Sequence, residues 1–196
     1  MTKGETTRQT VLDRAAATAS RIGLAGLTIG TLAADTGLSK SGLFAHFQSK
    51  ESLQAQVLAH ARELFADRVV RPALAAPRGE DRVRALFEHW VAIGREGGPS
   101  CLFVSASTEY DDQPGPIRDQ LVRDHLDFAD SVAQMFRTGI SEGQFRPDAD
   151  PDQFAHDLHG AMLGFFHAHR LLAAPAAEAR TRRAFENLLA AARVTP

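Results

Sequence analysis

The side chains best suited to chemistry gather in two places, and neither has the spacing of a catalytic site. Four histidines, His156, His159, His167 and His169, crowd one apolar stretch near the C-terminus, where imidazoles could bind a metal ion. The His-Glu-x-x-His and Glu-x-x-His patterns of helical metal sites are both absent. We therefore predict no metal centre and expect these histidines to lie in a core or an interface.

Nucleophilic and phosphate-binding motifs are equally scarce. Cys101 is the only cysteine, and no arrangement in the sequence argues for its activation. A Gly-rich phosphate loop and a Gly-x-Ser-x-Gly motif are both missing. We expect no enzyme activity and no cofactor. A metal-dependent enzyme built on the His-rich helix 152–172 stays open as an alternative.

The second group is small, polar and cationic: Ser39, Lys40, Ser41 and Gly42. These residues open the second of two short helical patterns within 28–47. Thr28 can cap the first pattern, Gly37 supplies a left-handed end, and Ser39 can cap the second. Two helices joined by such a corner form a helix-turn-helix, whose second helix enters the DNA major groove N-terminus first.

Apolar residues at helical spacing would hold this corner together. Leu43 and Phe47 share one face at i and i+4, and Leu38 is expected to be a buried anchor within the turn. Ahead of the motif, residues 7–22 show the spacing of another helix. The first 50 residues are therefore predicted to be a three-helix DNA-binding domain.

The stretch LSKSGLFAHFQSKESL resembles the DNA-binding region of the TetR family of transcriptional regulators. The family pattern places an aliphatic residue, an aromatic residue, a His or Tyr, a Phe, a turn, then Lys-Glu and Leu. Seven residues fit these places: Leu43, Phe44, His46, Phe47, Lys50, Glu51 and Leu53. The resemblance covers roughly the first 55 residues, and GLAGLT at 23–28 also resembles the family's link between its first two helices.

The resemblance implies a DNA-contacting set formed by Thr28, Ser39, Lys40, Ser41, Gly42, Phe44, His46 and Lys50. Lys40, Ser41 and Gly42 are expected near base edges. Thr28, Ser39, His46 and Lys50 are expected at phosphates. Phe44 stands where the family usually has Tyr and cannot make its hydroxyl contact, so we expect Phe44 to pack instead.

The distribution of charge along the chain also favours DNA binding by the N-terminal segment. Residues 1–50 carry six cations and three acids, a net charge of +3, which leaves −5 for the remainder of a chain of net charge −2. A basic head on an acidic body suits a DNA-reading domain attached to a body with another role. A lone cysteine, no signal peptide and no long apolar run predict a soluble cytoplasmic protein without a membrane partner.

The remaining residues, 51–196, are also predicted to be entirely α-helical. Ser49 can cap a helix from 50 to about 70, ended by Arg71-Pro72, which joins the head to the body. Breaks at Gly and Pro separate further helical patterns, and about nine helices are expected in all. These patterns fall at 80–95, 101–110, 116–142, 152–172 and 176–194.

The helix 152–172 is apolar over much of its surface, so it must be buried on more than one side. A second copy of the last two helices is the expected partner, as the family resemblance also implies. A two-fold dimer spaces two reading helices for adjacent major grooves. The expected interface residues are His156, Gly160, Gly164, Phe185, Leu188 and Leu189.

The resemblance further implies an effector pocket between helices of the body. Its expected lining is Trp90, Cys101, Phe103, His125, Phe128, Met135, Met162 and Phe166. The sequence and this resemblance together predict a homodimeric repressor. A small apolar effector is expected to release it from a double-stranded operator. A helix-turn-helix protein that binds DNA or a partner without an effector stays open.

Overall fold

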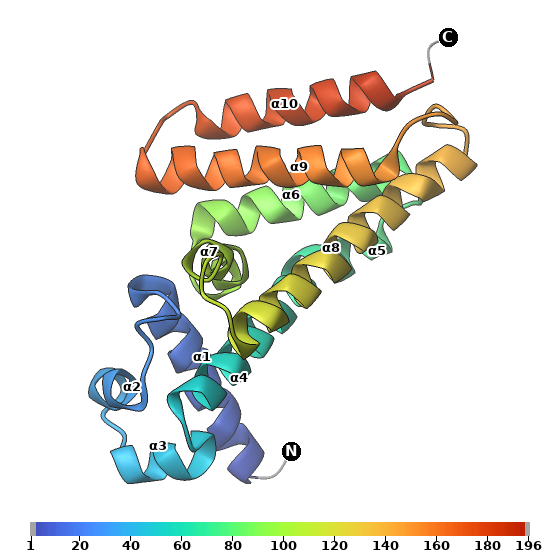
Figure 1. The fold of residues 1–196 in the computed structure, drawn as a ribbon. Helices are drawn as coiled ribbons and strands as arrows, with labels where there is room; N and C mark the ends of the chain where they lie inside the picture. Colours follow the sequence, from blue (N-terminus) through green and yellow to red (C-terminus); the bar gives the residue numbers. More distant parts are fainter. Residues whose placement is uncertain (1–2, 195–196) are drawn as a thin grey trace. The chain divides into compact units, whose positions relative to one another are not determined.

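The computed structural model describes residues 3–194, apart from the side chains of 3–7 and 100. Regular structure in this range is helical, with one isolated bridge between Phe145 and Arg193. The predicted all-α class is confirmed. Figure 1 shows the helices, which are α1 (Lys3–Ile22), α2 (Ile29–Thr36), α3 (Lys40–Phe47), α4 (Lys50–Phe65), α5 (Arg71–Ala75), α6 (Glu80–Glu96), α7 (Leu102–Glu109), α8 (Pro116–Ser141), α9 (Pro151–Phe166) and α10 (Ala177–Ala192).

Two long helices are less regular than their patterns predicted. The helix expected over 50–70 changes to a π-helical turn at Ala66–Val70 and then continues as α5. Pro72 does not end it, because proline is tolerated in the first turn of a new helix segment. The helix expected over 152–172 similarly becomes a π-helical turn at His167–Leu171.

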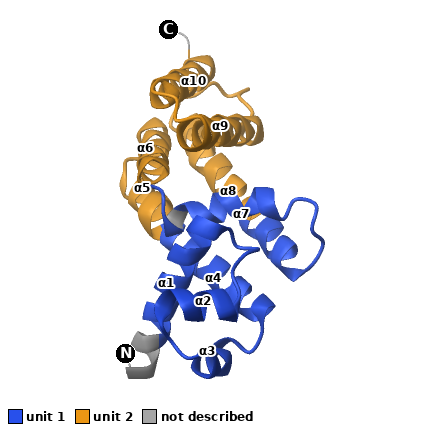
Figure 2. Cartoon of the chain, turned by 90° about the vertical axis from the view of Figure 1, so that its left-hand side faces the viewer, with its two compact units in different colours: residues 1–66, 97–124 blue, residues 67–96, 125–196 orange. Residues whose placement is uncertain are grey.

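The chain forms two compact units, coloured separately in Figure 2. Unit 1 contains residues 1–66 and 97–124, and unit 2 contains residues 67–96 and 125–196. Unit 1 therefore combines the helix-turn-helix segment with α7 and the beginning of α8. The boundary expected at residue 50 divides the chain into two consecutive segments. The two units instead reflect backbone packing, and each is formed by two separate segments.

The core of unit 1 joins segments that are far apart in the sequence. Leu27, Leu43 and Phe47 come from the head, and Leu102 and Ala106 of α7 pack in the same apolar cluster. A polar link adds to it, since Arg62 in α4 pairs with the buried Asp124 in α8 at 3.0 Å. The head thus packs against residues that follow it in the sequence by more than 50 positions.

Unit 2 is held by stacked rings and by an ion-pair network. Phe87 of α6 stacks on Phe185 of α10 with ring centroids 4.0 Å apart. At the start of α6, Glu80 accepts hydrogen bonds from Arg84 and from Arg193, which lies just beyond α10. The bonds from Arg193 are the main cause that lowers the pKa of Glu80 to about 2. Aromatic packing and charge therefore both fasten α10 to α6.

Candidate nucleic-acid interface

The start of α3 is a small polar surface with a defined backbone geometry. Ser39 Oγ accepts the backbone N–H of Gly42 at 3.1 Å, which confirms the predicted cap. Lys40, Ser41 and Gly42 are exposed, whereas Leu43 and Phe47 are buried in the core of unit 1. One face of the start of α3 is therefore fixed by core packing, while the opposite face is exposed to solvent.

The corner before α3 also has the predicted chemistry. Gly37 adopts φ 70°, a left-handed conformation that glycine tolerates best, and its N–H bonds to the Ala33 carbonyl. Thr28 caps α2, and it exchanges hydrogen bonds with Thr31, whose backbone N–H lies 3.0 Å from Thr28 Oγ1. Both ends of α2 are thus closed by local hydrogen bonds.

Two apolar residues of this region lie where sequence reasoning did not expect them. Leu38 was predicted to be a buried anchor, but it is 44% exposed. Phe44 was expected to pack, but it is 58% exposed, because Leu43 and Phe47 already occupy the inward face of α3. The structure therefore places the Phe44 ring on the surface of the head.

His46 and Lys50 complete the exposed set. His46 lies in the last turn of α3, and Lys50 begins α4 directly after the Ser49 cap. Ser49 Oγ accepts the N–H of Ser52 at 3.0 Å, as predicted. A cation at a helix N-terminus opposes the helix dipole, and a nearby anion would relieve this conflict.

Sequence reasoning missed two residues that position the head. Asp35 accepts hydrogen bonds from Thr18 and Arg21 of α1, each at 2.5 Å. The Thr18 hydrogen bond is the largest cause that lowers the pKa of Asp35. Its spacing from Thr18 and Arg21 offered no signal, because the contact joins two different helices.

The other missed residue is Gln54, which is only 4% exposed. Its Nε2 donates to the carbonyls of Leu24 at 2.7 Å and Leu27 at 3.2 Å, both in the loop between α1 and α2. The only signal in the sequence was a glutamine among the apolar positions of this helix, because a polar side chain on a buried face needs hydrogen-bond partners. Gln54 fixes the loop that leads into the helix-turn-helix.

The residues predicted for an effector pocket fall into both units. Cys101 and Phe103 are buried in unit 1, while Trp90, Phe128, Met135 and Met162 are buried in unit 2 and Phe166 is half-buried there. Within unit 2, Trp90 lies edge-on to Phe128 with centroids 5.0 Å apart. The structure therefore brings part of the predicted set together around Trp90.

A pair of histidines lies beside this tryptophan. The His159 ring is 5.7 Å from the Trp90 ring and 5.6 Å from the His125 ring, between centroids. Burial is the main cause that lowers the pKa of His159 to about 4, followed by the neighbouring His125 and His156. His159 is therefore neutral at pH 7, and it adds a polar group to an otherwise apolar cluster.

The residues predicted for a dimer interface differ in exposure. His156, Gly160 and Gly164 are exposed along α9, and an added Cβ at either glycine would meet nothing within 4 Å. Leu188 is half-buried. Phe185 and Leu189 are buried inside unit 2, so they contribute to the packing of the protomer itself.

Two further searches of the structure concern metal ions and membranes. In the described part of the chain, no group of three or more His, Cys, Asp or Glu side chains could hold a metal ion. Of the helices between residues 3 and 194, none combines the length and the apolar character needed to cross a bilayer.

Two family profiles match the chain. One, described as "Bacterial regulatory proteins, tetR family", matches residues 11–57. The other, described as "Tetracyclin repressor-like, C-terminal domain", matches residues 79–185. Among curated proteins, no match was found.

Solved structures share this fold over most or all of the chain. A TetR transcriptional regulator from Chloroflexus aurantiacus J-10-FL is 25% identical, with 100% of each chain covered and a TM-score of 0.86. A TetR-family regulator from Cytophaga hutchinsonii is 20% identical, covering 100% of this chain and 99% of that chain, with a TM-score of 0.86. AibR, solved with isovaleryl coenzyme A and operator DNA, is 22% identical, covering 82% and 84%, with a TM-score of 0.65. With its capped and exposed α3, the chain belongs to the TetR family of DNA-binding transcriptional regulators.

Proposed function

We propose that this regulator is a homodimeric repressor that places two α3 helices in successive major grooves of a roughly palindromic operator. The observation that carries this proposal is the first turn of α3. Ser39 caps it, Leu43 and Phe47 anchor it, and Lys40 and Ser41 remain exposed. Such a turn can approach base edges without losing any core contact.

Each exposed residue has a role that suits its chemistry. Lys40 and Ser41 read base edges, and Gly42 lets the backbone approach the groove closely. Ser39, whose oxygen already accepts the Gly42 N–H, can donate its own O–H to a phosphate. Phosphate contacts set affinity and register, while base contacts set specificity.

The flanking residues Thr28, His46 and Lys50 contact phosphates in this proposal. Phe44 takes a different role from the one its sequence suggested. Its exposed ring can make an apolar contact with a thymine methyl group, since such contacts need no hydrogen bond. The family's usual tyrosine hydroxyl is therefore replaced by an apolar contact.

The dimer forms through the exposed face of α9. His156, Gly160, Leu163 and Gly164 lie on this face, and the two glycines leave room for a close helix. Leu188 of α10 extends the surface. Phe185 and Leu189 support it from inside the protomer and make no contact across the two-fold axis.

In this proposal residues 1–50 form the DNA-binding domain and residues 51–196 form the body. A small, largely apolar effector enters the body. The cluster around Trp90 in unit 2 supports an apolar site with a neutral histidine as its polar group. AibR, which has a similar fold, has been solved with isovaleryl coenzyme A and operator DNA, and this supports a ligand-responsive regulator. The effector must bind the arrangement that releases DNA more tightly, because otherwise no equilibrium shifts.

Selection of bound sequences from random double-stranded DNA tests the proposal. We expect a palindromic consensus at low salt, bound by a dimer. Lys40→Gln and Ser41→Ala should change the preferred bases, whereas Arg123→Gln, an exposed change in α8, should leave the consensus intact. An absence of any sequence preference in the wild-type protein would overturn the proposal.

The effector is tested separately. A thermal-shift screen with small hydrophobic compounds should find some that stabilise the protein, and these should release the selected operator. Compounds that stabilise the protein without releasing the operator would contradict the proposed regulation but not the proposed DNA binding. The lone buried Cys101 and the DNA partner support a cytoplasmic location for this activity.

A further inference from the structure

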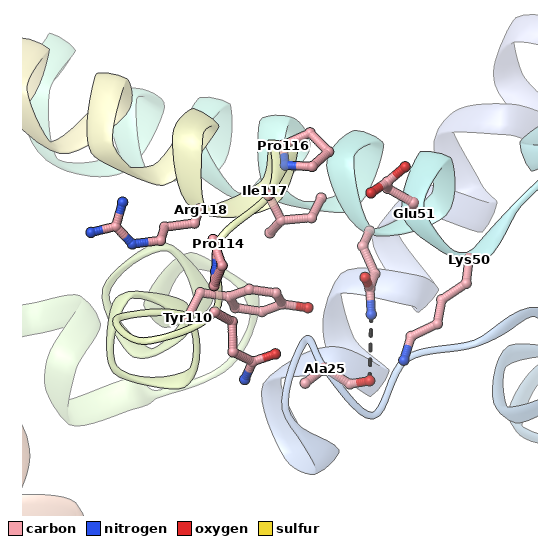
Figure 3. Close-up of a pocket in the computed structure, with 11 residues that line it drawn as sticks. Ala25, Lys50, Glu51, Tyr110, Pro114, Pro116, Ile117 and Arg118 are labelled. Atoms are coloured by element: carbon pink, nitrogen blue, oxygen red, sulfur yellow. Dashed lines mark hydrogen bonds between the residues drawn. The ribbon is translucent and has the colours of Figure 1, made fainter.

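A groove in unit 1 lies outside the effector site proposed above. Its volume is about 290 Å³, and Figure 3 shows residues that line it. The start of α4 forms one wall, and the loop from α7 to α8 forms the other. This volume lies near the lower limit of small-molecule pockets, so it suits a ligand of about ten heavy atoms.

The electrostatics of the groove favour an anion. Lys50 lies at one end and Arg118 at the other, and both belong to the first turns of helices of 16 and 26 residues. Gly115 has no side chain to cap α8, and its carbonyl accepts the Asp119 N–H as the first bond of that helix. The positive ends of the two helix dipoles add to the two cations.

The floor of the groove is apolar and carries one hydroxyl. Tyr110 and Ile117 are both nearly buried, and Pro114 extends this surface. Figure 3 shows the Tyr110 hydroxyl on the side of the groove where Lys50 lies. Burial is the main cause that raises the pKa of Tyr110, so its hydroxyl remains a proton donor at neutral pH.

One acid limits the charge that the groove accepts. Glu51 lines the same wall as Lys50, and it is exposed without an ion pair among the described contacts. A second negative charge on a ligand would lie close to this carboxylate and be disfavoured. Gln54 offers no further donor, because its Nε2 already serves the carbonyls of the α1–α2 loop.

We propose that this groove is a binding site for a small organic monocarboxylate with an apolar body. The carboxylate lies between Lys50 Nζ and the Tyr110 hydroxyl, and the apolar body covers Pro114 and Ile117. The site is separate from the cluster around Trp90, which belongs to unit 2. It would give the regulator a second small-molecule input, located in the same unit as the DNA-binding helices.

A consequence follows that rests on the proposed function. Lys50 is a phosphate contact in that proposal, so a carboxylate that pairs with Lys50 competes with the operator. Ligand binding to the groove would then weaken DNA binding directly, with no displacement of the body.

The chain carries its own reporters for the test, since it has one tyrosine and one tryptophan. With ring-labelled tyrosine and tryptophan, the NMR resonances of Tyr110 and Trp90 report on unit 1 and unit 2 separately. The probe is benzoate, and methyl benzoate and inorganic phosphate are the controls. We expect benzoate to shift Tyr110 saturably and to leave Trp90 unchanged, while both controls bind at least about tenfold more weakly.

Two variants sharpen the assignment. Lys50→Gln should weaken benzoate binding about tenfold, whereas Lys40→Gln, also an exposed lysine of the head, should bind as the wild type does. Glu51→Gln should tighten benzoate binding several-fold, a gain that misfolding cannot produce. Equal binding of benzoate and methyl benzoate, or a shift of Trp90 without Tyr110, would overturn the proposal.

DNA competition is measured last, on the Arg123→Gln variant and the wild type, with the selected operator. Benzoate should raise the apparent Kd for DNA in both. Since the Tyr110 titration needs no DNA, a protein that binds benzoate but no operator would refute the proposed function alone. Operator binding with a silent Tyr110 would refute the groove alone.

Discussion

Glu109 Oε2, in α7, accepts the backbone N–H of Ala25, in the loop between α1 and α2, at 2.9 Å. The two residues are 84 positions apart, yet both belong to unit 1. Gly23 lies against the same carboxylate, since an added Cβ there would be 2.9 Å from Glu109 Oε2. The helix α7, which lies within the C-terminal family match at residues 79–185, therefore holds the loop that leads into the helix-turn-helix.

Glu109→Ala should destabilise unit 1 by about 1–2 kcal/mol, because a charged hydrogen-bond acceptor for a half-buried N–H is lost. Hydrogen exchange should show faster exchange of the Ala25 amide, and operator affinity should fall with the loosened loop. Glu109→Gln keeps an acceptor oxygen and is the matched control. An unchanged Ala25 exchange rate in Glu109→Ala would show that the bond does not form in solution.

Lys50→Ala should weaken binding to all DNA sequences alike. A dimer loses two phosphate contacts, so the slope of log K against log salt should become shallower by roughly two. Filter binding or fluorescence anisotropy across a salt series measures this slope. If the variant instead altered the selected consensus, Lys50 would be a base contact and its proposed role would be wrong.

Gly160→Leu should weaken the dimer by more than tenfold, because the new side chain fills the space proposed for the partner helix. The protomer itself should tolerate the change, since a Cβ there meets nothing within 4 Å and leucine favours helices over glycine. Sedimentation at several concentrations gives the dimer Kd. Gln134→Leu, an exposed change in α8, is the control. An unaltered Gly160→Leu dimer would remove Gly160 from the interface.

His159 should make unit 2 less stable in mild acid. Its folded pKa of about 4 lies below the ordinary value of 6.5, so the unfolded chain binds an extra proton between these values. Stability is therefore full above pH 6.5 and is lost as the pH falls toward 4. The loss in the wild type should reach roughly 2 kcal/mol for this partly buried group.

Urea unfolding at pH 7.5 and pH 5 measures this difference. His159→Gln does not titrate, so its stability should change less between the two conditions. His167→Gln, an exposed histidine beyond α9, is the control and should retain the wild-type difference. Identical pH dependence in the wild type and His159→Gln would place the imidazole in water.

Most of the helix-turn-helix could be predicted from the sequence, because its determinants are local. Thr28, Ser39 and Ser49 each accept a backbone N–H three residues later, and Gly37 ends α2 in a left-handed conformation. Such bonds depend on neighbours within one helical turn. The all-α class and the nine predicted helices follow equally from periodicity and breaks.

The sequence by itself determined the all-α class, the caps of the helix-turn-helix and the segment proposed to contact DNA, although it misplaced the ends of two long helices. Tertiary structure alone decided which apolar residues are used inside: Phe44 and Leu38 are exposed, while Phe185 and Leu189 pack within the protomer. It also decided that α7 supports the head and that the Lys50–Tyr110 groove exists. The physical reason is range, since a cap needs only adjacent residues, whereas burial and concavity depend on segments that meet only after the chain has folded.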